Sequence, residues 1–491
     1  MPGKLVIERP LSPGENFFRC RTNQGFYYNF ASVAAFSRDV TQDLPLLFRA
    51  LRKSLLDYHV FICNVFRDPE AEASLVRPMK MASFGDLVQF QPELFSPHGA
   101  PVPETCLHDL CRTELFHLNV EKPLFKIFVY GTHDVAAAFE HTLFDGVVAL
   151  YLQEILLENL AYCDDPANSR EYSEKYGPAP ACVDLSTVIF SYSDDAKYLC
   201  NSLPPPLETV MQDLNVDFTD NDPRHYSRVA PEGYPEKWPG RFPASKDVHV
   251  AFKTINIPAG DFARVLEKCK QNGVTFTAYL NLIQALVLRP IFGEKHHSLS
   301  LVAITLRRFL SPEKVADGYK DIVARSDYRI CGMYANMGVP ELLPPVQQFS
   351  WDHVRAINGR LAQSVRNDRL LSMSRRWYLE SSPEGDNAEF FGPALGKNVA
   401  DAVKISNLGL ARFPVYGNNS GKEPWTVNDI VFAQDLAPNA AHFVFNAVSS
   451  ARGGLNIVMS YFDHRFDDCE HENFDAYPGM LKRLLLEHAG L

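Results

Sequence analysis

The sequence predicts an α/β protein built from two lobes. At 491 residues the chain is longer than one hydrophobic core usually supports, so two domains are the default expectation. Segments with the apolar spacing of helices alternate with strand-like segments in both halves of the chain. A proline-rich stretch interrupts this pattern between the halves. We therefore expect a first lobe at 1–200, a crossover at 201–245 and a second lobe at 246–491.

The first lobe is expected to contain an amphipathic helix at 43–57, with Thr41 as its candidate N-cap. A β-rich stretch at 58–67 follows this helix. Strands at 123–130 and 135–140 flank the turn residues 131–134 and predict a hairpin. An apolar helix is expected to start just after Gly146.

The second lobe begins with a predicted strand at 247–257 and continues with helices at 258–271 and 274–288. Strands are expected at 300–306, into 405–409, at 442–448 and at 455–462, with helices near 351–365 and at 478–488. The apolar segment 274–288 is too short to cross a bilayer core of about 30 Å, so it is interpreted as a core helix. The apolar run 480–486 is expected to pack on its own domain, and contact with a membrane or lipid droplet is the alternative.

Composition excludes some classes of function. The formal charge of −11 and the absence of a basic stripe argue against a nucleic-acid partner. Cys106 and Cys111, with His108 between them, form the only close pair among ten cysteines, and no matching pair completes a zinc site. The N-terminus has no apolar run typical of a signal peptide. Free thiols and a cytoplasmic location follow as expectations, with peripheral contact to the endoplasmic reticulum or lipid droplets as the alternative.

His141 is the leading candidate for a catalytic residue. It lies between the strand-like run 135–140 and the apolar helix, with Asp145 and Gly146 following it. Imidazole has an ordinary pKa of about 6.5, which suits a general base at cellular pH. Asp145 precedes an apolar helix and is a natural N-cap. On these residues alone, a buried core histidine remains the alternative for His141.

Two other histidines also have an aspartate four residues later, His464 and His471. His464 precedes Asp468, but Cys469 stands where a glycine would complete the same motif. His471 lies in a polar run, with Ala476 after its aspartate. The order of the surrounding segments therefore favours His141.

Four motifs in order resemble the acyltransferase superfamily that includes chloramphenicol acetyltransferase, plant BAHD enzymes, condensation domains of peptide synthetases and fungal alcohol acetyltransferases. They are the Leu-rich helix leading to His59, the His-x-x-x-Asp-Gly run from His141, Thr305-Leu-Arg307, and Ser406-Asn-Leu-Gly409. Residues 15–18 and 25–27 resemble the opening of the fungal alcohol acetyltransferase branch. The BAHD signature Asp-Phe-Gly-Trp-Gly is absent, and Trp425 lies in Glu-Pro-Trp-Thr instead.

The resemblance implies a two-lobed chloramphenicol acetyltransferase-like fold, with mixed sheets, flanking helices and a tunnel between the lobes. Acetyl-CoA would enter as co-substrate from one side and the acceptor from the other, without a permanent cofactor or a metal. His141 would deprotonate an alcohol for direct O-acetylation, and a long-chain amine or sphingoid-like acceptor is the alternative. We expect a monomer.

The resemblance also implies roles for the residues around His141. Asp145 would face away from the base and pair with Arg307, while Gly146 would let the backbone approach the substrate or form the turn. Ser406 and Asn407 are candidate donors to the oxyanion or to the substrate, and a simple strand-end turn is the alternative for both.

Three rival hypotheses remain. His464 lies in a stretch similar to the Asp-His-Arg-x-x-Asp-Gly motif of dihydrolipoyl acyltransferases in the same superfamily, which makes it the alternative base. A non-catalytic acyl- or CoA-binding module would keep the fold without needing a base. A condensation-type enzyme would need a basic surface for an acidic carrier protein, which the net charge disfavours.

Overall fold

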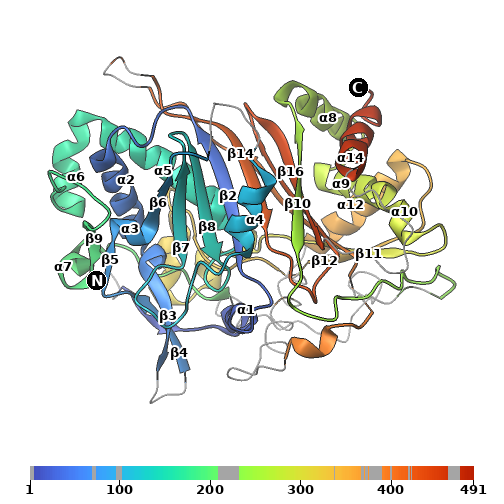
Figure 1. Ribbon diagram of the computed structural model, residues 1–491, viewed down its shortest axis with the longest axis horizontal. Coiled ribbons are helices and arrows are strands. Elements are labelled where there is room, and N and C mark those ends of the chain that lie inside the picture. The colour runs from blue at the N-terminus through green and yellow to red at the C-terminus, as the bar shows by residue number, and fades with distance from the viewer. Residues whose placement is uncertain are drawn as a thin grey trace.

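The computed structural model describes residues 5–491 except 69–72, 95–101, 208–229, 231, 337, 366–369, 371–373, 375–389, 399–400, 418–420, 422 and 463–475. His464 and His471 lie outside the described residues. Two mixed β-sheets stand next to each other with helices packed around them, as Figure 1 shows. The predicted class, a two-lobed α/β protein with mixed sheets, is confirmed.

The first sheet has five strands in the order β14-β2-β8-β7-β6. Its strands are β14 (Val427–Gln434), β2 (Asn29–Phe36), β8 (Asp134–Glu140), β7 (Phe125–Tyr130) and β6 (Val88–Gln91). Strands β7 and β8 form the predicted antiparallel hairpin, and β6 runs parallel to β7. Two smaller sheets flank this lobe, one of β1 (Arg9–Pro10), β4 (Ala73–Pro78) and β3 (Cys63–Asp68), the other of β5 (Met81–Ser83) and β9 (Val188–Ser191).

The second sheet has six strands in the order β10-β16-β15-β13-β11-β12. They are β10 (Val250–Ile257), β16 (Gly454–Phe462), β15 (Phe443–Ser450), β13 (Val403–Ala411), β11 (Ser298–Val302) and β12 (Val339–Leu343). Strand β13 runs parallel to both β11 and β15, while the other pairs are antiparallel.

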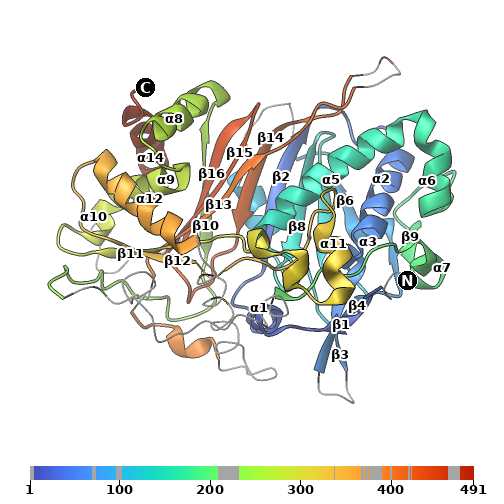
Figure 2. The ribbon, with the colours of Figure 1, turned by 180° about the vertical axis from the view of Figure 1, so that it is seen from behind.

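Helices cover both sheets. Those of the first part of the chain are α1 (Pro13–Asn23), α2 (Leu44–Asp57), α3 (Phe84–Leu87), α4 (Glu104–Arg112), α5 (Gly146–Asp164), α6 (Ser169–Tyr176) and α7 (Tyr192–Asp195). Those of the second part are α8 (Ala259–Gln271), α9 (Phe276–Val287), α10 (Arg289–Phe292), α11 (Lys320–Ala324), α12 (Trp351–Val365) and α14 (Ala476–Glu487). Seen from behind in Figure 2, α5 lies across the first sheet.

Two local predictions need correction. Asp43, not Thr41, caps α2, because its side chain accepts a hydrogen bond from the Leu46 amide at 2.9 Å, while Thr41 donates to Asp39. The strand predicted at 300–306 is β11, which ends at Val302, and Arg307 lies in the 3₁₀ turn Arg307–Phe309. The helices predicted at 258–271, 274–288 and near 351–365 are confirmed, with observed bounds Ala259–Gln271, Phe276–Val287 and Trp351–Val365.

The two lobes exchange elements along the chain. Strand β14 comes from the last third of the sequence, yet it pairs antiparallel with β2 and completes the first sheet. Helix α1, from the start of the chain, places Phe17 and Phe18 in the hydrophobic core of the second lobe. The boundaries near residues 200 and 246 stay a prediction.

The C-terminal helix α14 packs on its own lobe. Tyr477, Leu481 and Leu485 are buried in the second core. Within the described ranges no helix combines the length and the apolar character that a membrane span requires, and no group of three or more His, Cys, Asp or Glu side chains could hold a metal ion. Cys106 and Cys111 are buried free thiols on α4.

Candidate active site

His141 lies in the turn that connects the first sheet to its longest helix. Strand β8, which lies between β2 and β7, ends at Glu140, and α5 begins at Gly146. Asp145 caps α5 by accepting a hydrogen bond from the Val147 amide at 3.2 Å. A capped helix start and a paired strand end fix the backbone on both sides of His141.

Aromatic rings enclose the imidazole of His141. The ring of Phe18 stacks on it, with centroids 4.3 Å apart and an interplanar angle of 12°. Phe30 meets it edge-on at 5.0 Å and Tyr27 lies at 5.4 Å. The side chain is only 8% exposed, and Nδ1 is enclosed without a hydrogen bond to the described part of the chain. Nε2 is therefore the nitrogen that a substrate can reach.

The surroundings keep the imidazole neutral. Burial lowers the pKa of His141 well below its ordinary value of about 6.5. The positive charges of Arg21 and Lys404 lower it further, and the backbone carbonyls of His141 and Phe144 oppose this only in part. The ring is thus in the form that can accept a proton at cellular pH.

Asp145 is directed to the second lobe rather than to the imidazole. Its Oδ2 lies 2.7 Å from Nη1 of Arg307 and accepts a hydrogen bond from the Tyr334 amide at 2.8 Å. Arg307 also donates to the carbonyls of Ile330 and Gly332. These contacts hold the guanidinium of Arg307 between Asp145 and the chain segment 330–332.

Gly146 lies between a strand of the first sheet and a strand of the second. A Cβ atom on this residue would stand 2.9 Å from Cζ of Phe432 on β14 and 3.3 Å from Cδ2 of Leu408 on β13. Both distances are shorter than ordinary van der Waals contact. The glycine therefore lets a strand of each sheet pack directly against the start of α5.

Ser406 and Asn407 lie on opposite faces of β13. The amide of Asn407 donates to Thr277 Oγ1 on α9 at 3.0 Å, and its Oδ1 accepts from the Gly409 amide at 2.9 Å. Ser406 is half-buried on the other face, and its hydroxyl makes no hydrogen bond to the residues that the structure describes. Of the two predicted donors, only Ser406 shares the face of Leu408, which reaches the turn of His141.

The whole chain is similar to proteins with this architecture. The family model for alcohol acetyltransferase matches residues 14–485. The chain belongs to the alcohol acetyltransferase family. The resemblance found in the sequence motifs is thereby confirmed, and the protein is an acyltransferase.

Solved structures agree in fold with this alcohol acetyltransferase family member. Trichothecene 15-O-acetyltransferase from Fusarium sporotrichioides superposes with a TM-score of 0.64 at 13% identity, covering 98% of this chain and 94% of its own. The epimerization domain from the third module of tyrocidine synthetase B gives a TM-score of 0.56 at 14% identity, covering 100% and 99%. The first condensation domain of the calcium-dependent antibiotic synthetase gives 0.54 at 15% identity, covering 99% and 98%. No curated protein matches the chain.

Several residues around the imidazole were not expected from the sequence. Glu140 is fully buried and accepts hydrogen bonds from Thr22 Oγ1 at 2.7 Å and from the Thr142 amide at 2.6 Å. Burial raises the pKa of Glu140 above its ordinary value, and these hydrogen bonds offset only part of that rise. Through Thr22, Glu140 ties α1, which carries Phe18, to the end of the strand that precedes His141. An acid at the end of an apolar strand was the signal that could have revealed it.

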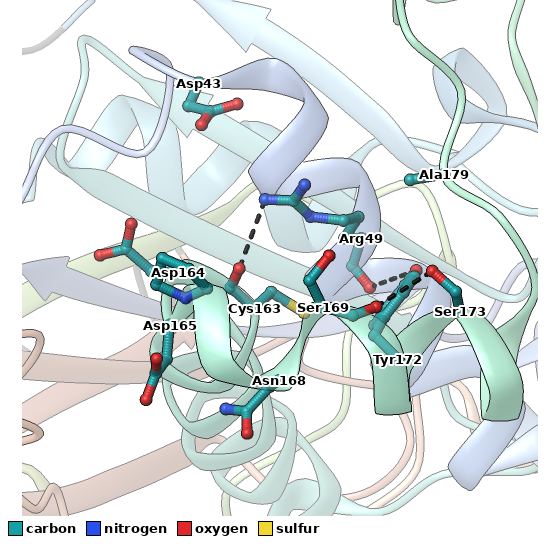
Figure 3. A pocket seen from close by; sticks show the side chains of 11 residues that line it. Asp43, Arg49, Cys163, Asp164, Asp165, Asn168, Ser169, Tyr172, Ser173 and Ala179 are labelled. Atoms are coloured by element: carbon teal, nitrogen blue, oxygen red, sulfur yellow. Dashed lines mark hydrogen bonds between the residues drawn. The ribbon is translucent and has the colours of Figure 1, made fainter.

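A separate surface pocket of about 330 Å³ lies at the far end of α5, and Figure 3 shows its lining. There Arg49 donates to the Cys163 carbonyl at 3.3 Å, and Asp43 and Asp165 cap the starts of α2 and a 3₁₀ helix. The polar groups of this pocket thus serve local structure, and none of the predicted site residues lines it. The candidate active site of the acyltransferase is therefore the region around His141.

Proposed function

We propose that this protein transfers an acetyl group from acetyl-CoA to a hydroxyl group of a small acceptor, with His141 as general base. The placement of His141 carries the proposal: its ring is held between the lobes, with Nδ1 enclosed and Nε2 accessible. Membership of the alcohol acetyltransferase family and the fold shared with trichothecene 15-O-acetyltransferase support an alcohol as acceptor.

The reaction proceeds by direct transfer. Nε2 of His141 takes the proton of the acceptor hydroxyl as the oxygen attacks the thioester carbon. The carbonyl π bond opens to an oxyanion, toward which the Ser406 hydroxyl donates a hydrogen bond. When the carbonyl re-forms, the C–S bond breaks and the thiolate takes the proton from the imidazolium. The products are an acetate ester and free CoA thiol, and His141 is neutral again.

Asp145 and Arg307 act in this mechanism by positioning. Their ion pair joins the helix start behind His141 to the second lobe, so the base and β13 keep a fixed separation. Holding two substrates in line across such an interface supplies a large part of the rate enhancement in bimolecular reactions. A positioned base adds roughly 10²- to 10⁴-fold.

The test is thiol release from acetyl-CoA with a panel of alcohols and long-chain amines. For His141→Ala we expect kcat to fall by roughly 10²- to 10⁴-fold, with a wild-type affinity for CoA measured by calorimetry. His353→Ala, which changes an exposed histidine on α12, is the matched control and should keep wild-type activity. Loss of activity in His464→Ala but not in His141→Ala would place the base in the second lobe. Activity with amines alone would favour N-acetylation, and wild-type protein that binds CoA without turnover would favour a binding module.

A further inference from the structure

A lysine lies two residues before Ser406 on β13. Val403 and Ile405 are fully buried in the core of the second lobe, so Lys404, between them, points to the opposite face. Lys404 is in register with Val444 of β15, and Val444 belongs to the core of the first lobe. Residues that face each other in register share a face of the sheet. Lys404 therefore points toward the first lobe, on the same side as Ser406.

Among the residues that the structure describes, the ammonium group of Lys404 has no close counter-charge. It is half-buried and forms neither an ion pair nor a hydrogen bond within the described part of the chain. Asp401 acts on it only at longer range, and burial together with the charge of Arg21 lowers its pKa to about 8. Most of the group is still charged at neutral pH. Buried charges in proteins are normally paired, so this cation is suited to a partner brought in by a substrate.

Two other cations near the site, unlike Lys404, have a close carboxylate partner. Arg307 lies 2.7 Å from Asp145, and Arg112 lies 3.1 Å from Asp435. Arg21 places its guanidinium over the ring of Tyr27, 4.0 Å from the centroid, and Tyr27 in turn contacts His141. Arg21 thereby adds positive potential to the same region.

These charges act on whatever binds at the base. Arg21 and Lys404 are the two charged groups with the largest effect on His141. A group that hydrogen-bonds to Nε2 experiences the same potential, which repels an ammonium and attracts a carboxylate. The phosphates of CoA are separated from its thioester by the whole pantetheine arm, so a cation close to the base is badly placed to reach them.

We propose that Lys404 binds an anionic group of the acceptor, so that the preferred acceptor is a hydroxy acid whose carboxylate lies close to the reacting hydroxyl. Lys404 is then a specificity-determining residue, and the site discriminates against amines. The proposal rests on the proposed function, because it assumes that acyl transfer takes place beside His141.

The test compares three acceptors with one alkyl tail: a β-hydroxy carboxylate, its primary amide and the corresponding amino alcohol. Wild type should prefer the carboxylate to the amide by about tenfold in kcat/KM, as a hydrogen bond to a charged group provides, and the amino alcohol should be poorest. In Lys404→Met the preference for the carboxylate should vanish, whereas Lys404→Arg should keep it. Each preference is a ratio of two kcat/KM values measured on one enzyme preparation. A smaller fraction of folded protein lowers both values equally and leaves the ratio unchanged. Lys270→Met, an exposed lysine on α8, should keep the wild-type ratio.

Three results would overturn the proposal. The first is a wild type that treats carboxylate and amide alike, and the second is a Lys404→Met variant that retains the preference. The third is a Lys404→Met variant with a raised KM for acetyl-CoA but not for acetyl-pantetheine, which would assign Lys404 to the phosphates of the donor. Calorimetric binding of the β-hydroxy carboxylate to wild type and Lys404→Met provides a readout without turnover. Binding that depends on Lys404, with no thiol release, would refute the proposed function while supporting the anion site.

Discussion

The carboxylate of Asp145 lies 2.7 Å from the guanidinium of Arg307 and makes no hydrogen bond to His141. Both side chains are buried, with exposed fractions of 1% and 9%. The ion pair therefore joins the turn of the first lobe to the 3₁₀ turn of the second, and the aspartate four residues after the base serves the architecture of the site. Four further consequences can be measured.

Asp145→Asn should destabilise the protein strongly. Removing one partner of a buried ion pair leaves the other charge uncompensated, at a cost of roughly 3–5 kcal/mol. Urea denaturation should show this loss in the free energy of unfolding. Glu174→Gln is the control, because it breaks the exposed pair with Arg170 and should cost about 0.5 kcal/mol or less. Equal midpoints for the two variants would contradict a structural role for Asp145.

Gly146→Ala should reduce stability and activity together. The new methyl group would stand 2.9 Å from Cζ of Phe432, a side chain that is itself fully buried. Overpacking of this kind costs typically about 1–3 kcal/mol and forces neighbours to move. Thermal unfolding and thiol release together should detect both effects.

The control for this steric effect is a double variant. Phe432→Leu removes the ring atoms that the new methyl group would meet, so Gly146→Ala should cost less stability in the Phe432→Leu background than in wild type. For residues in contact, the effects of two substitutions on the free energy of unfolding typically depart from additivity by about 0.5–3 kcal/mol. We expect a departure in this range. Strictly additive effects would show that Phe432 is not what restricts position 146.

The pH profile of kcat/KM should report the lowered pKa of His141. Only the neutral imidazole accepts a proton, so activity should persist as the pH falls through 6.5 and be lost only at lower pH. Lys404→Met removes a positive charge that lowers the pKa of His141. The acid limb of the variant's pH profile should therefore move to higher pH. An acid limb at or above the ordinary pKa of histidine in wild type, or no shift in the variant, would contradict this assignment.

Local pattern predicted much of the fold and the centre of the site. Helical periodicity located α2, α9 and α12, and alternation located the β7–β8 hairpin with His141 at its end. The pairing of β14 with β2 joins residues about four hundred positions apart, and no local pattern specifies such a partner. Nothing in the local pattern singles out Lys404, because only tertiary packing reveals that its face of β13 meets the other lobe.

His59 should make stability depend on acidity. It is completely buried, and neither ring nitrogen has a hydrogen-bond partner among the described residues, so burial lowers its pKa to about 4. An unfolded chain binds this proton from about pH 6.5 downward. Between these two values the unfolded state holds more protons, so the free energy of unfolding should fall as the pH falls, by roughly 3 kcal/mol from this group. His59→Leu should flatten urea-derived stability over that range, while the exposed His353→Leu keeps the wild-type slope. A His59→Leu slope equal to that of wild type would show that His59 does not titrate in this way.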